Sequence, residues 1–166
     1  MPTTGFEVRR ATAADAAVLA HHRVAMFRDM GKLDPQLEPE LIDRCRRRFE
    51  QVVPAGEYLA WLVYPSDDPS KIVCGGGVQL RTLYPRTDVD GMKILDGPEA
   101  IVLNVYCEPE YRRRGLARML MEAILAWAKT AGIVRLVLHA SDDGRPLYES
   151  IGFEPTNEMR YTGPLG

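Results

Sequence analysis

The feature that most constrains the fold is a strand–helix–strand succession in the second half of the chain. Residues 100–107 (AIVLNVYC) form a continuous apolar run of the length of a buried strand. After Gly115, apolar side chains recur at helical spacing; they are Leu116, Met119, Leu120, Ala123, Ile124, Trp127 and Ala128. Gly132 ends this helix, and residues 133–139 (IVRLVLH) return to a strand pattern. A helix between two such strands predicts a crossover connection with the strands parallel.

The residues before this unit predict one strand followed by two helices. Residues 6–10 alternate in the manner of a short strand. Thr12 offers a side-chain oxygen at the N-cap of a helix over residues 13–27, which Gly31 ends. Residues 35–53 carry apolar side chains at helical spacing and stop before a proline, which favours a second helix.

The middle of the chain predicts a hairpin. Residues 58–64 (YLAWLVY) and 72–83 (IVCGGGVQLRTL) are rich in β-branched and aromatic side chains, and a turn sequence with two prolines separates them. Three consecutive glycines at 75–77 indicate a bulge or a close approach of another backbone. Residues 85–99 are typical of a loop.

The C-terminal part predicts a short helix at 145–151, ended by Gly152, and then a closing strand at 153–161. These elements together predict an α/β fold in which helices flank a mixed, mostly antiparallel sheet with one parallel pair. The length of the chain is that of one ordinary domain, and we expect residues 1–166 to form a single unit.

The composition excludes several function classes. With 46% apolar residues, 27% charged residues and a formal net charge of -2, the chain is typical of a soluble globular protein and not of one that binds nucleic acid. No stretch approaches the roughly 18 apolar residues of a membrane span, and the N-terminus lacks the basic-then-apolar order of a secretory signal. We therefore expect a cytoplasmic protein without nucleic-acid or membrane partners.

The cysteines predict neither a disulfide framework nor a metal site. Cys45, Cys74 and Cys107 are odd in number and show no C-x-x-C spacing. His21 and His22 are adjacent and so face different sides of the predicted helix, which does not suit paired metal ligands. We expect reduced thiols in a cytoplasm and no bound metal.

Arginines cluster at the start of the amphipathic helix, in YRRRGLARMLM at 111–121. A helix N-terminus already carries partial positive charge, which disfavours a cation there by roughly 0.3–1 kcal/mol. The free N–H groups of a first turn bind anions, however, and Gly115 lets a ligand approach them closely. A bound pyrophosphate explains the arginines, the glycine and the small Ala117 together. The alternative is that Arg112 and Arg113 are solvated loop residues.

Two motifs in this half of the chain occur together. Residues Arg112 to Ala117 spell R-x-x-G-x-A, and residues 145–153 (RPLYESIGF) contain L-Y-x-x-x-G-F. With these motifs the sequence resembles the GNAT acyltransferase superfamily, whose pyrophosphate-binding signature is [QR]-x-x-G-x-[GA]. The resemblance is tight over residues 100–153, and residues 6–84 agree only in the order of their predicted elements. It implies a GNAT-like sheet whose parallel strand pair splays apart, and it implies acetyl-CoA as the cofactor.

The resemblance also implies residue roles. Backbone groups of Val105 to Cys107 would pair with the pantetheine arm, and one of their N–H groups would polarise the thioester carbonyl. Tyr148 holds the position that in many relatives faces the departing sulfur, where a phenol protonates the thiolate; a core aromatic is the alternative. Ser141 is expected in a cofactor contact or, equally, in the cap of the next helix. The implied cofactor-binding residues are Val105, Tyr106, Cys107, Arg112, Arg113, Arg114, Gly115, Leu116, Ala117, Arg118 and Ser141.

The acyl acceptor is expected between the first two helices and the strand at 100–107. Arg23 and Phe27 supply cationic and aromatic groups there, and Asn104 is placed to orient the acceptor. The arginines at 44 and 46–48 are expected to be solvated, with help in holding an acidic acceptor as the alternative.

The general base is left unassigned. Some GNAT proteins carry a glutamate in this strand, but the matching position is Ile101 here. Glu99 and Glu108 flank the strand and are candidates for acting through water, with a structural role as the alternative for each.

These features predict transfer of an acetyl group from acetyl-CoA to a primary amine of a small molecule or peptide, by direct attack in a ternary complex. The missing strand glutamate leaves a non-catalytic acyl-CoA-binding sensor as the alternative, and an interaction domain without a cofactor is a third reading. The exposed edges of the predicted sheet permit a homodimer.

Overall fold

Five strands build the main sheet of the computed structural model, which describes residues 3–166. In sheet order they are β1 (Phe6–Arg10), β2 (Tyr58–Pro65), β3 (Cys74–Thr82), β6 (Pro98–Cys107) and β7 (Arg135–Leu138). The first four strands pair antiparallel, and only β6 and β7 are parallel. Helix α3 (Leu116–Thr130) connects this pair, which confirms the predicted crossover and the mixed, mostly antiparallel sheet.

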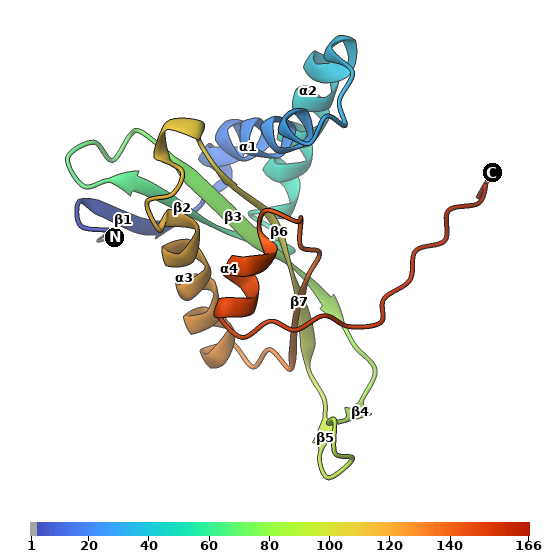
Figure 1. Ribbon diagram of the computed structural model, residues 1–166. Helices are drawn as coiled ribbons and strands as arrows, with labels where there is room; N and C mark the ends of the chain where they lie inside the picture. The colour runs from blue at the N-terminus through green and yellow to red at the C-terminus, as the bar shows by residue number, and fades with distance from the viewer. Residues whose placement is uncertain (1–2) are drawn as a thin grey trace.

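Helices cover both faces of the sheet (Figure 1). On one face lie α1 (Ala16–Asp29) and α2 (Glu38–Val52), which begin with the 3-10 turns η1 (Ala13–Asp15) and η2 (Pro35–Leu37). The other face carries α3 and the short helix α4 (Arg145–Ser150). The alternation of side chains along β2 explains this arrangement, because Ala60 and Leu62 belong to the core beneath α1 and α2 whereas Trp61 and Val63 belong to the core beneath α3.

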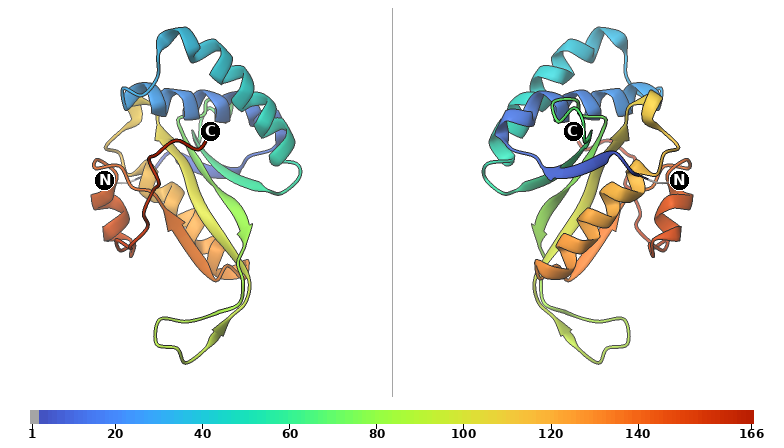
Figure 2. Two further views of the ribbon diagram at one scale, coloured as in Figure 1. Left: turned by 90° about the vertical axis from the view of Figure 1, so that its right-hand side faces the viewer. Right: turned by 90° about the vertical axis from the view of Figure 1, so that its left-hand side faces the viewer.

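Two segments differ from the sequence-based expectation. Residues 85–99 contain a small hairpin of β4 (Arg86–Thr87) and β5 (Ile94–Leu95), which projects from the end of the sheet remote from α1 and α2 (Figure 2). Residues 153–161 form no strand and continue into a C-terminal tail that leaves the body of the protein (Figure 1). Strand-like residues need a partner strand and a buried face, and this segment is largely exposed.

The glycine run in β3 marks a β-bulge, as predicted. Gly75 pairs with Tyr106 and Gly77 pairs with Leu103, so two residues of β6 stand opposite the single Gly76. One of them, Asn104, has a positive φ of 61°. A Cβ atom on Gly77 would lie 2.5 Å from the carbonyl oxygen of Leu59, so the close backbone approach also requires glycine.

The expectation of reduced thiols is wrong for two of the three cysteines. Cys74 and Cys107 form a disulfide, and Cys45 is free and buried. The register of β3 and β6 places the bonded cysteines directly opposite each other, with their Cα atoms 4.0 Å apart. They are separated by 33 residues in the sequence, and cysteine spacing alone carries no information about such a cross-strand pair.

Among residues 3–166, no helix has the length and apolar character that crossing a membrane requires.

Candidate active site

The parallel strands β6 and β7 separate along part of their length. They pair only between residues 99–102 and 135–138, and β6 then continues to Cys107 while β7 ends at Leu138. The edge of β6 that would face β7 is therefore open beside the bulge at Asn104 and Val105. This is the splayed pair that the resemblance implied, and it leaves backbone N–H and C=O groups available to an extended ligand.

The side chains of the open segment point into the protein. Tyr106 is 8% exposed, and its ring lies 5.3 Å from the ring of His22 in α1. The sulfur of Cys107 is used in the disulfide. Only the backbone of these two residues is therefore suited to contact a cofactor.

The loop after β6 forms a cradle of backbone amides. It begins with the 3-10 turn η3 (Pro109–Tyr111) and passes through left-handed conformations at Arg113 (φ 59°) and Gly115 (φ 77°), the N-cap of α3. Within residues 3–166, no protein acceptor takes the N–H groups of Gly115, Leu116 and Ala117. Unpaired amides at the positive end of a 15-residue helix are suited to bind an anion.

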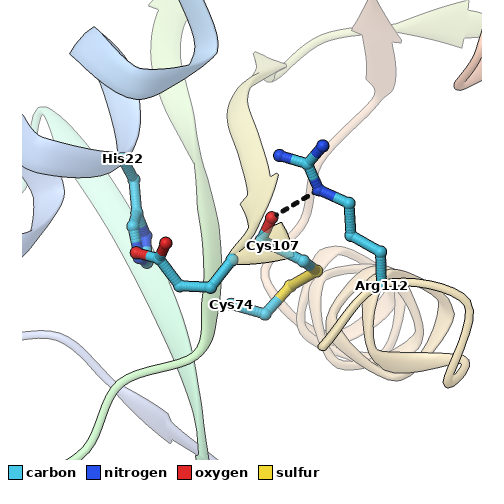
Figure 3. The surroundings of a disulfide bond; sticks show 5 residues. His22, Cys74, Cys107 and Arg112 are labelled. Carbon is cyan, nitrogen blue, oxygen red and sulfur yellow. Dashed lines mark hydrogen bonds and ion pairs between the residues drawn. A yellow bond between two sulfur atoms is a disulfide. The ribbon is translucent and has the colours of Figure 1, made fainter. Parts of the chain in front are cut away.

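The arginines around this cradle have different partners. Arg112 donates from Nε to the carbonyl oxygen of Cys107 at 2.9 Å (Figure 3). Its Nη2 donates to Asp29 at 2.5 Å, so Arg112 ties the loop to both β6 and α1. The hydrogen bond to Asp29 raises the pKa of Arg112. Arg114 lies over the ring of Tyr111 at 5.1 Å. Neither Arg113 nor Arg114 forms an ion pair within the described residues, which leaves both charges for a ligand.

Arg118 has a structural contact of its own. Its Nη2 atom donates to the hydroxyl of Ser150 at 2.6 Å, which joins the first turn of α3 to the last residue of α4. Arg118 therefore fixes α4 relative to the cradle.

Tyr148 lies on α4 against the core beneath α3. Its ring packs edge-on against Phe153, with centroids 6.1 Å apart, and burial raises the pKa of its hydroxyl. A Cβ atom on Gly144 would lie 2.8 Å from this ring, so a larger residue at this position would shift the tyrosine. Ser141 accepts a hydrogen bond from the N–H of Gly144, the N-cap residue of α4, at 3.2 Å.

On the opposite face, Asn104 is the centre of a polar chain. Arg23 Nη1 donates to Asn104 Oδ1 at 2.6 Å, and Asn104 Nδ2 donates to the hydroxyl of Tyr58 at 3.0 Å. The guanidinium of Arg23 also lies 5.0 Å from the ring centroid of Phe27, so the three predicted acceptor residues come together. Sequence reasoning missed Tyr58, because nothing but a place at the start of a strand marks it. Burial raises the pKa of Tyr58 to about 12, so its hydroxyl stays neutral.

A cavity of about 450 Å³ lies beside this chain. Its polar wall includes Arg23, Asn104 and Tyr58, and its apolar wall includes Leu41, Phe49 and Leu103. The cavity is thus bounded by α1, α2 and β6, where the acceptor was expected.

The two candidate carboxylates at the ends of β6 have different surroundings. The side chain of Glu99 is fully buried and forms ion pairs with Arg81 and Arg135. Burial acts to raise the pKa of Glu99, but the two arginines outweigh it and the pKa falls below its usual range. Glu108 is partly exposed, and its Oε1 lies 2.6 Å from Nε2 of His21. Glu108 is therefore the carboxylate that remains accessible.

His22, on α1, is buried, and the strands separate it from the disulfide of Cys74 and Cys107 (Figure 3). Neither of its ring nitrogens has a hydrogen-bond partner within residues 3–166, and Nε2 lies 3.6 Å from Glu108 Oε1. Burial, aided by the neighbouring His21, lowers the pKa of His22 to about 4. A Cβ atom on Gly75 would lie 2.9 Å from Nδ1 of His22, so the first glycine of the run makes room for this ring.

Comparison with known families gives one family match. Residues 61–155 match the family described as the acetyltransferase (GNAT) domain. Among curated proteins, an aminoglycoside N(6')-acetyltransferase type 1 of Acinetobacter genomosp. 13 is 33% identical over 67 residues, which is 39% of this chain and 46% of that protein. The [ribosomal protein bS18]-alanine N-acetyltransferase of Salmonella typhimurium is 40% identical over 65 residues, 37% of this chain and 44% of the relative. The chain thus spans less than half the length of these two relatives.

Solved structures resemble the whole chain. A GCN5-related N-acetyltransferase from Ralstonia eutropha superposes with a TM-score of 0.80 at 29% identity, covering 95% of this chain and 98% of the other. A predicted acetyltransferase from Clostridium acetobutylicum, solved with acetyl-CoA, gives a TM-score of 0.75 at 22% identity over 95% and 96% of the two chains. At 22% identity, the similarity to the Clostridium acetobutylicum protein shows a shared fold alone.

Proposed function

The chain belongs to the GNAT acetyltransferase family, and on that premise we propose that it transfers an acetyl group from acetyl-CoA to a primary amine of a small molecule or peptide. The transfer occurs by direct attack in a ternary complex. The observation that carries the proposal is the cradle of unpaired amides at Gly115, placed next to the open edge of β6. Acetyl-CoA is a diphosphate joined to an arm that contains amide groups. A site for an anion next to an unpaired strand edge suits both parts of it.

Acetyl-CoA supplies an acyl group activated as a thioester. The amides of Gly115 to Ala117, with Arg113 and Arg114, hold the pyrophosphate by charge-assisted hydrogen bonds. The backbone of Val105 and Cys107 pairs with the pantetheine arm. These groups fix the thioester beside the bulge, where the cavity next to Asn104 opens.

Three groups act on the reacting atoms. The N–H of Val105 stabilises the negative charge that develops on the carbonyl oxygen while the C–N bond forms. As the C–S bond breaks, Tyr148 donates its proton to the departing thiolate, and its raised pKa keeps that proton in place at neutral pH. Glu108, with His21, accepts the proton of the amine through water, since Glu99 is held by two arginines.

Calorimetry with coenzyme A tests the cradle. We expect micromolar-range binding that Arg114→Glu weakens at least tenfold, because the substitution puts a negative charge beside the pyrophosphate. Arg86→Glu is the matched control, since Arg86 is exposed on the β4–β5 hairpin. Absence of binding, or equal weakening by both variants, would contradict the proposal. Binding without turnover of any amine would support the sensor.

The base is tested separately by pH profiles of kcat/KM. Glu108→Gln is expected to remove the acidic limb of the profile, whereas Glu99→Gln retains it. An unchanged limb in Glu108→Gln would exclude Glu108 as the base.

A further inference from the structure

The cavity beside Asn104 carries more positive than negative charge. Three arginines line it, Arg23, Arg44 and Arg48, together with one acidic residue, Glu57. No ion pair joins Glu57 to any of them within residues 3–166. The cavity wall therefore carries more positive charge from its arginines than its one carboxylate neutralises.

The arginines of α2 differ in their partners. Arg44 pairs with Glu40 at 2.5 Å, Arg46 with Asp43 at 3.0 Å, and Arg47 with the same Asp43. Such pairs one turn apart on an exposed helix are the usual arrangement of a solvated face. Arg48 is the exception on this helix, because no carboxylate lies within 4.0 Å of it in the described part of the chain.

Arg23 is the second unbalanced cation. Arg23 is only partly exposed, and its guanidinium donates a hydrogen bond to the neutral amide oxygen of Asn104. A guanidinium in a partly dehydrated position loses hydration, and one neutral acceptor and the ring of Phe27 replace it without balancing the charge of Arg23. An anionic ligand in the cavity would offset that loss for Arg23 and would also pair with Arg48, which is exposed and lines the same cavity.

We propose that the acyl acceptor is a small amine that also carries a carboxylate or a phosphate, which Arg23 and Arg48 bind in this cavity. The inference rests on the proposed acetyl transfer and names the class of its acceptor. A volume of about 450 Å³ suits a small molecule, and the apolar wall of Leu41, Phe49 and Leu103 suits an aliphatic or aromatic body. Both anions share the geometry that a guanidinium binds through two parallel hydrogen bonds.

Polycationic amines are expected to be poor acceptors. One of the curated relatives is an aminoglycoside acetyltransferase, but the alignment covers only 39% of this chain. A polycation entering a cavity with unpaired Arg23 and Arg48 meets like charges. The positive charge of this cavity therefore disfavours such substrates.

Matched pairs of amines test the proposal. Tyramine and tyrosine differ by a carboxylate, and ethanolamine and O-phosphoethanolamine differ by a phosphate. With acetyl-CoA fixed and free thiol followed, we expect kcat/KM to be at least tenfold higher for the anionic member of one pair, and the pair that shows the ratio identifies the anion. Arg48→Gln should bring that ratio close to one, mainly by raising KM, whereas the control Arg47→Gln, which lies outside the cavity lining, should leave it intact.

Calorimetry with the same four molecules separates the two proposals. Binding of tyrosine or O-phosphoethanolamine to the complex with coenzyme A, lost in Arg48→Gln, supports the inference even where no thiol is released. Release of thiol at equal rates from both members of each pair overturns the anionic acceptor and leaves acetyl transfer standing. If coenzyme A fails to bind, the proposed function fails first, and equal binding of all four molecules overturns the inference.

Discussion

Asn104 Nδ2 donates a hydrogen bond to the hydroxyl of Tyr58 at 3.0 Å, which joins the bulge of β6 to the first residue of β2. The other end of the same amide accepts from Arg23, so one side chain links a buried phenol to an arginine of the cavity wall. Asn104 is also in a left-handed conformation, which asparagine adopts more readily than most residues. The bulge that opens β6 is thus held by side-chain bonds and by backbone preference together.

Substitution of Asn104 separates these two contributions. Asn104→Gly keeps the positive φ without strain but loses both hydrogen bonds, so we expect a loss of about 1–3 kcal/mol in the free energy of unfolding. Asn104→Ala should lose about 1 kcal/mol more, because a Cβ atom is disfavoured at this φ. Urea denaturation of both variants measures the difference. Equal stability of the two variants would show that the conformation of the bulge carries no strain.

Tyr148→Phe is expected to lower kcat by about 10²–10⁴ if chemistry limits the rate, because the departing thiolate loses its proton donor. The affinity for coenzyme A should not change, since the ring and its packing on Phe153 remain. Single-turnover measurements isolate the chemical step. Tyr161→Phe, on the exposed tail, is the control and should match the wild type. A wild-type rate in Tyr148→Phe would show that Tyr148 packs in the core and donates no proton.

Glu99 should stabilise the fold and take no part in proton transfer. Glu99→Gln leaves Arg81 and Arg135 without their shared carboxylate. Because both arginines are about half exposed and solvent screens the lost attraction, we expect a loss of about 1–2 kcal/mol at pH 7. The pKa of Glu99 is lowered in the folded state, so its contribution is present above the ordinary value of 4.5 and is lost as pH falls through the folded value. Denaturation of both proteins at pH 7 and pH 3.5 should show the difference shrinking. If the stability difference between the two proteins is the same at both pH values, the ion pairs of Glu99 do not stabilise the fold.

The buried His22 should make the fold sensitive to mild acid. Its pKa is about 4 in the folded protein and 6.5 in the unfolded chain, so the unfolded state gains protons first as pH falls from 6.5 toward 4. This alone lowers the free energy of unfolding by about 2 kcal/mol at pH 5. The groups that face the ring are His21, Glu108 and Tyr106. NMR titration of the imidazole measures the pKa directly, and a midpoint near 6.5 would refute its desolvation.

Reduction of the bond between Cys74 and Cys107 should lower stability without unfolding the protein outright. The cross-link closes a loop over 33 positions, for which chain entropy predicts a loss of about 3–4 kcal/mol. Urea denaturation with and without reductant measures it. A Cys74→Ala, Cys107→Ala double variant is the control and should not respond to reductant. Three free thiols in the unreduced protein would show that the bond is absent in solution.

Local sequence patterns were enough to predict most elements of the fold. The apolar stripe after Gly115 predicts α3, because helical spacing is a property of neighbouring residues. The run at 100–107 predicts a buried strand for the same reason. There were two exceptions. Residues 153–161 have strand propensity but no partner strand covers them, and the predicted loop at 85–99 contains the β4–β5 hairpin.

The amino-acid sequence by itself determined the crossover unit and the glycine-containing loop at the start of α3, because each depends on residues close together in the chain. Only the tertiary structure decided that Cys74 meets Cys107, that Glu99 is held by two arginines and that Tyr58 supports Asn104. These contacts join residues from 18 to 46 positions apart. Which of them form depends on the register between strands, and register follows from packing of the whole sheet rather than from the pattern along any one strand.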